Sequence, residues 1–138
     1  MRKHTFIRTV MTGLMLAAAL SVACGDDPAG VPGIQPEIVN NVDNFQFQVT
    51  AVNNYTGSLD YTWSNTGVSA NVDQSCSVSG GTVMLALIDD AGQTVYTKNL
   101  SEGGSFASST GTTGTWRIHV TMMQASGNLN FRVDKRTP

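Results

Sequence analysis

Hydrophobic and polar residues alternate along most of the chain from residue 43 onward, as they do in strands with one buried face. Turn-forming residues interrupt the alternation at regular intervals, and no helical period is visible. The pattern predicts a single all-β domain, a β-sandwich of jelly-roll or immunoglobulin-like type with about seven or eight antiparallel strands. The expected strands include residues 45–51, 59–63, 68–78, 83–88 and 94–97. The last two are expected to form a hairpin, because the turn-forming residues 89–92 lie between them.

The C-terminal part of the chain shows the clearest alternation. Residues 116–122 and 129–133 are each hydrophobic at every second position, and a Ser-Gly pair at 126–127 lies between them. This arrangement predicts a hairpin that turns at the Ser-Gly pair. In such a hairpin His119 would face Asp134 on the neighbouring strand.

Residues 83–88 are hydrophobic on both faces, which predicts a central strand. Its second face carries Met84 and Ile88, which would form a possible interaction surface if nothing covers them. The alternative is that they are covered by residues 101–114. That stretch is rich in Gly, Ser and Thr and predicts a loop with one short strand.

Exposed aromatic side chains often stack on sugar rings, so the position of each aromatic residue matters for function. Trp63 and Trp116 share a face with apolar neighbours, which predicts that both lie in the core. Tyr96 is expected to point outward, which makes it a third candidate for the interaction surface.

The N-terminus differs in composition from the rest of the chain. Three basic residues among the first eight precede a mostly apolar run over residues 10–23. A basic start followed by a short apolar run is typical of a secretory signal peptide. The run has about 14 residues, fewer than the ~20 that a membrane-spanning helix needs. Residues 1–23 are therefore predicted to be removed during export.

The run ends in Leu20-Ser21-Val22-Ala23-Cys24, which resembles the lipobox of bacterial lipoproteins. The resemblance implies that Cys24 is acylated, for example with palmitate, and becomes the first residue of a membrane-anchored mature chain. In the family a Leu usually precedes the Cys by three positions, whereas Leu20 precedes Cys24 by four. Ser21 and Ala23 would also suit ordinary signal peptidase, so simple secretion is the alternative.

The stretch 24–42 contains three of the four prolines and few hydrophobic residues. It is expected to be a flexible tether between the lipid and a domain over residues 43–138. The residue after Cys24 is Gly25. In some lipoprotein groups an Asp at this position retains the protein at the inner membrane, so the outer membrane is expected here, with either its periplasmic or its surface face.

Beyond residue 23 the chain has five Lys and Arg against ten Asp and Glu. A chain with this balance has no electrostatic reason to bind nucleic acid or anionic lipid headgroups. Contact with the membrane is therefore expected through the lipid anchor on Cys24 alone.

Residues able to carry catalysis or bind a metal are few and dispersed. His119 is the sole histidine beyond residue 23, and catalysis would require it to line a cleft. Asp89 and Asp90 lack the further carboxylates of a calcium site, so they are expected to cap a turn. Cys76 is expected to be a small strand residue or, if Cys24 is not acylated, its disulfide partner. We expect no catalytic residue, no metal and no cofactor.

The segment from residue 78 to residue 133 contains GTVMLAL, then DAGQTV, then GTWRIHV and GNLNF. This succession of strand, turn and Gly-Thr-aromatic strand is similar to the pre-peptidase C-terminal β-sandwich modules of secreted bacterial proteases. The resemblance implies a non-catalytic module. The sequence thus predicts a binding or accessory module of the cell envelope with a protein or glycan partner. The alternative is a structural subunit of an envelope or surface assembly, and a hydrolase comes third.

Overall fold

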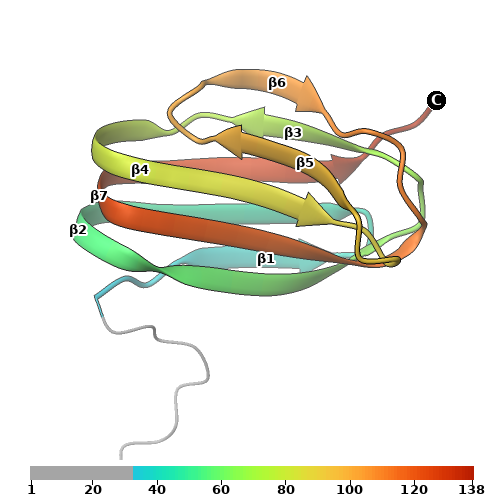
Figure 1. The fold of residues 1–138 in the computed structure, drawn as a ribbon, viewed down its shortest axis with the longest axis horizontal. Helices are drawn as coiled ribbons and strands as arrows, with labels where there is room; N and C mark the ends of the chain where they lie inside the picture. The colour runs from blue at the N-terminus through green and yellow to red at the C-terminus, as the bar shows by residue number, and fades with distance from the viewer. Residues whose placement is uncertain (1–32) are drawn as a thin grey trace, which may run out of the picture.

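The computed structural model describes residues 33–138, which form an antiparallel sheet of seven strands and no helix (Figure 1). The strands are β1 (Glu37–Asn41), β2 (Asn44–Asn65), β3 (Ala70–Gln74), β4 (Ser77–Ile88), β5 (Thr94–Asn99), β6 (Gly104–Ala107) and β7 (Gly114–Lys135). The prediction of an all-β, sandwich-like domain is confirmed. Within the described part of the chain, no helix is suited to crossing a membrane.

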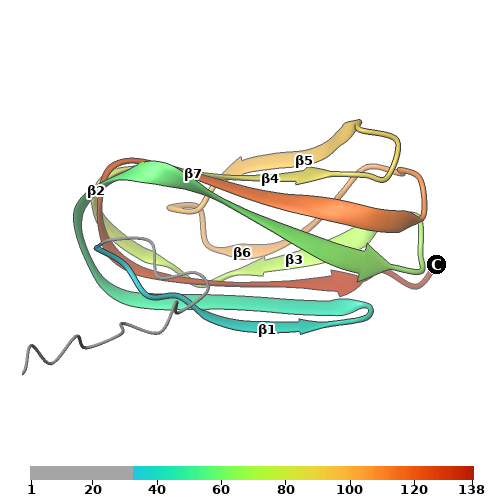
Figure 2. The same cartoon turned by 90° about the horizontal axis from the view of Figure 1, so that it is seen from below.

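Two long strands build both layers of the fold. β2 and β7 are each 22 residues long and pair with each other on both sides of a bend (Figure 2, left). The first half of β2 and the second half of β7 lie in a five-stranded layer with the order β1-β2-β7-β3-β6. Their other halves lie in a four-stranded layer, in which β4 pairs with β7 and β5 pairs with β4.

At the bend, residues with positive φ shift the register of the paired strands. Ala51 has a φ of 56° in β2, and Gln124 and Gly127 have φ values of 48° and 129° in β7. The Ala51 N–H donates to Asn128 Oδ1 at 2.9 Å, and the Gln124 N–H donates to Thr56 Oγ1 at 2.9 Å. Irregularities of this kind let a strand bend sharply without losing its partners.

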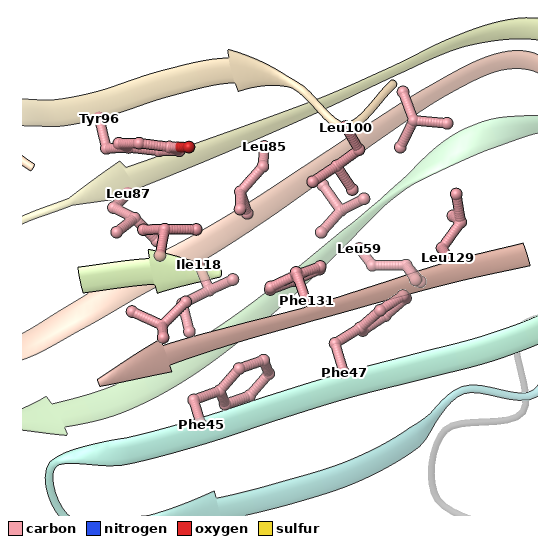
Figure 3. Packing of buried hydrophobic residues seen from close by; sticks show 14 of the residues in the cluster. Phe45, Phe47, Leu59, Leu85, Leu87, Tyr96, Leu100, Ile118, Leu129 and Phe131 are labelled. Atoms are coloured by element: carbon pink, nitrogen blue, oxygen red, sulfur yellow. The ribbon is translucent and has the colours of Figure 1, made fainter. Parts of the chain in front are cut away.

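The core between the layers is formed by aromatic and aliphatic side chains (Figure 3). The rings of Phe47 and Phe131 stack with centroids 4.9 Å apart in the five-stranded layer. Tyr61, from the other layer, contacts Phe45 and Phe47 with ring centroids 5.4 Å and 6.1 Å apart. Trp63 and Trp116 are buried, as predicted, with their rings perpendicular.

The structure confirms the predicted β4–β5 hairpin, the central position of β4 and a short strand, β6, in the predicted loop. It shows that the predicted C-terminal hairpin is wrong, because β7 continues through the Ser-Gly pair without reversing. Gly127 has a positive φ, which a bulge and a tight turn can both require. The glycine therefore fits a bend as well as the predicted turn.

Two further boundaries differ from the prediction. Residues 37–41, expected in the flexible tether, form β1, which pairs with the first half of β2. Ile34, also in the predicted tether, is buried in the core. The expected strand 68–78 is divided between β3 and β4, which lie in different sheet positions.

Replacing Gly127 with Ala should destabilise the domain. A Cβ at this position would lie 2.1 Å from the carbonyl oxygen of Ser77, and the φ of 129° is unfavourable for any L side chain. We expect Gly127→Ala to lower the free energy of unfolding by at least about 1 kcal/mol in urea denaturation. Gly80→Ala is the control, because its Cβ would meet Ser126 at an ordinary 3.7 Å. Equal stability of the two variants would contradict this account of the bend.

Candidate functional site

The predicted hydrophobic face of β4 lies on the outside of the four-stranded layer. Met84, Ala86 and Ile88 are half-buried there, between a row of β7 side chains and a row of β5 side chains. The segment after β6 does not cover them. Its backbone N–H groups instead bond to carbonyls near β3 and β5, as from Ser108 to Ala70 and from Ser109 to Val95.

His119 lies on this same outer face rather than opposite Asp134. It is paired with Asp60 in β2, and its Nδ1 lies 2.7 Å from Asp60 Oδ1. Its Nε2 lies 3.0 Å from Thr121 Oγ1, so the three residues form a hydrogen-bonded row. The His119 side chain is 33% exposed on the sheet surface, outside the pockets described below. The His119 ring thus lies at a partly exposed position on the sheet surface, held by Asp60 and Thr121.

The prediction that Tyr96 points outward is wrong. Its side chain is buried, and its hydroxyl donates to Gln74 Oε1 at 2.6 Å. Gln74 in turn donates to the carbonyl of Glu102 at 2.6 Å, which ties β3 to the connection between β5 and β6. A β-bulge next to Leu87 turns Tyr96 inward, and simple alternation from Val95 does not anticipate it.

The described part of the chain contains one of the two cysteines, Cys76. Cys24 lies outside the described residues, so its acylation stays a prediction. Cys76 is half-buried between β3 and β4, and its Sγ lies 3.2 Å from both the backbone N and the carbonyl O of Asn130. Burial raises the pKa of the Cys76 thiol, which disfavours the reactive thiolate.

Asp89 and Asp90 hold loops at one end of the sandwich. Asp89 accepts hydrogen bonds from the backbone N–H groups of Gln93 and Thr112, both at 2.7 Å, and Asp90 accepts one from Thr115. These bonds lower the pKa of Asp89. Among residues 33–138, no group of three or more His, Cys, Asp and Glu side chains is placed to hold a metal ion.

A group of polar side chains occupies the outside of the five-stranded layer. Arg132 on β7 donates from Nη2 to Asp73 on β3, and its Nε forms an ion pair with Asp134, both at 2.8 Å. Asn44 donates to Asp134 and Ser105 donates to Asp73. We call Asn44, Asp73, Ser105, Arg132 and Asp134 the polar cluster. The hydrogen bonds that Asp73 accepts from Ser105 and Arg132 lower the pKa of its carboxyl group.

The polar cluster lies beside a hollow of about 480 Å³ on the face formed by β3, β6 and the end of β7. Asn71 and Arg136 complete its polar lining. Arg136 also lines a second pocket of about 610 Å³ at the end of the sandwich, together with Thr66, Val68 and Lys135. Among the described residues, the Arg136 guanidinium forms no ion pair, whereas Arg132 forms two.

Reasoning from the sequence missed the polar cluster. Its members come from four strands. The charged residue on β3, Asp73, is far in sequence from the charged residues on β7, Arg132 and Asp134. Alternation does place Asp73, Arg132 and Asp134 at outward positions of their strands. It does not show that β3 pairs with the second half of β7, which is what brings Asp73 opposite Arg132.

Comparison with known protein families and with curated proteins found no match. The resemblances to bacterial lipoproteins and to pre-peptidase C-terminal modules therefore depend on the residues quoted for them alone.

Acid should weaken the fold through the Asp89 carboxylate. Because its pKa is lowered in the folded state, its stabilising effect is present above the unfolded pKa of about 4 and is lost as the pH falls through the folded value. We expect Asp89→Asn to lower the urea midpoint at pH 7, and the difference from the wild type to shrink below about pH 4. Glu37→Gln, on an exposed residue of β1, is the control. A difference that stays constant from pH 7 to pH 2 would contradict the assignment.

Proposed function

We propose that this protein is a lipid-anchored, non-catalytic binding module of the bacterial cell envelope. The observation that carries the binding role is the polar cluster, a preorganised set of charged and amide side chains beside an open hollow. The position of His119 on a flat sheet surface supports a role without catalysis.

The proposed anchor is an acyl group on Cys24, supported by the apolar run and the small residues that precede it. Gly25 after the cysteine favours the outer membrane as its location. The described domain begins close to the anchor, since Ile34 already packs in the core. About 10 residues then separate Cys24 from the domain, a reach of at most ~35 Å. The module would therefore act near the membrane surface.

Replacing Cys24 tests the anchor. In cells grown with an alkyne-labelled palmitate, the wild-type chain should take up label and sediment with membranes. Cys24→Ala should lose the label completely, because no other residue of the proposed lipobox can be acylated on sulfur. Cys76→Ala is the matched control and should keep it. An unlabelled, soluble wild-type protein would show instead that ordinary signal peptidase releases the chain.

A structural role in an envelope assembly is the second candidate. It is favoured by the half-buried Met84, Ala86 and Ile88 and by Met123, which is 62% exposed and lies opposite Thr82 in the neighbouring strand. A subunit of this kind would use the outside of the four-stranded layer, on the opposite side of the sandwich from the polar cluster.

Photo-crosslinking in intact cells of the native host separates the two candidates. A diazirine amino acid would replace Asn71 at the hollow, Met84 on the other face or the exposed Ser64 as a control. The binding proposal predicts a crosslinked product from position 71 that is absent from position 64. Homogeneous oligomers from position 84 alone would support the assembly subunit, and products from neither position would contradict both candidates.

A further inference from the structure

The hollow on the five-stranded layer is balanced in charge. Two carboxylates, Asp73 and Asp134, and two guanidinium groups, Arg132 and Arg136, line it. A phosphate or sulfate would approach the two carboxylates, and a cationic ligand would approach the two guanidinium groups. The local charges therefore favour a ligand without net charge.

Donor and acceptor atoms alternate at short distance across the hollow. The Asp73 and Asp134 oxygens each lie 2.8 Å from a nitrogen of Arg132. A carboxylate accepts several hydrogen bonds and a guanidinium has five N–H donors, so both keep capacity for a ligand. Neighbouring hydroxyl groups on a sugar ring can donate to the carboxylate and accept from the guanidinium at once.

The polar cluster is held in place before any ligand arrives. Ser105 and Asn44 each bond to one carboxylate, and the two ion pairs fix Arg132 along the sheet. Side chains fixed in this way lose little conformational entropy on binding, so even a solvent-exposed site can bind a polar ligand.

A second depression adjoins the hollow. Arg136 lines both the hollow and the pocket at the end of the sandwich, so the two adjoin at this residue. The end pocket adds hydroxyl groups from Thr66, Ser69 and Thr110. The end pocket also has an apolar part of its lining, from Val68 and Pro138. We call the two adjoining depressions, of about 480 and 610 Å³, the groove; together they offer more space than a single sugar fills.

We propose that this groove binds a neutral glycan chain, with one part over Asp73, Arg132 and Asp134 and the next part passing Arg136 into the end pocket. The assignment rests on the proposed binding function and adds the class of ligand. Arg132 and the two carboxylates would bind the first sugars, and Arg136, which lines both depressions, would contribute more to the binding of longer chains.

Isothermal titration calorimetry of the detergent-solubilised full chain tests the proposal. The probes are neutral di- and hexasaccharides of glucose, mannose, galactose and N-acetylglucosamine, with a polygalacturonate hexamer as the charged comparison. At least one neutral hexasaccharide should bind, and Asp73→Asn should weaken both it and its disaccharide by about tenfold or more, the effect of one lost hydrogen bond to a charged group. Arg136→Ala should weaken the hexasaccharide by a similar factor and the disaccharide by clearly less.

Arg117→Ala, on the outside of the other layer, is the matched control and should bind like the wild type. The thermal midpoint of each variant is measured so that unfolding is not mistaken for lost contacts. Failure of every neutral hexasaccharide to bind, preferred binding of the charged hexamer, or equal effects of Arg136→Ala on both chain lengths would overturn the proposal. If the product crosslinked at position 71 then yields peptides of a second protein by mass spectrometry, the binding function stands and its ligand is a protein.

Discussion

In the bend between the two layers, three backbone N–H groups donate to side-chain oxygens of the paired strand. Ala51 donates to Asn128, Asn54 to Ser126 and Gln124 to Thr56. These bonds cross between β2 and β7 where the register shifts, so both strands bend at the same place and stay paired on either side. Every other strand pairs, directly or through one neighbour, with β2 or β7. The two-layer fold thus depends on this bend.

Because one pair of strands supplies both layers, the molecule has two outer faces of different chemistry. The four-stranded layer presents Met84, Ala86 and Ile88 beside the row of His119 and Asp60. The five-stranded layer presents the polar cluster and its hollow. The faces point in opposite directions, so a module of this kind can bind one partner without hindering contact on the other side.

The ion pairs of the polar cluster have little influence on stability. The side chains of Arg132 and Asp73 are 50% and 39% exposed, and pairs this exposed contribute about 0–1 kcal/mol. Stability comes instead from the buried aromatic and aliphatic core, in which Tyr61 joins the layers through Phe45 and Phe47. The polar cluster can therefore be altered or engaged by a ligand without unfolding the domain, which is what a binding site on a rigid scaffold requires.

The sequence by itself determined which residues face inward in the regular parts of the strands. Period-two alternation identified the all-β class and the burial of Trp63 and Trp116, because side-chain direction in a regular strand is a local property. The turn residues at 89–92 identified the β4–β5 hairpin, which is also a local signal. Pairing partners are not local. Whether a Ser-Gly pair reverses the chain or bends it depends on which strands lie beside it, so only the tertiary structure showed that β7 is continuous. For the same reason only the tertiary structure placed residues 37–41 in the sheet, turned Tyr96 inward and brought Asp73 against Arg132.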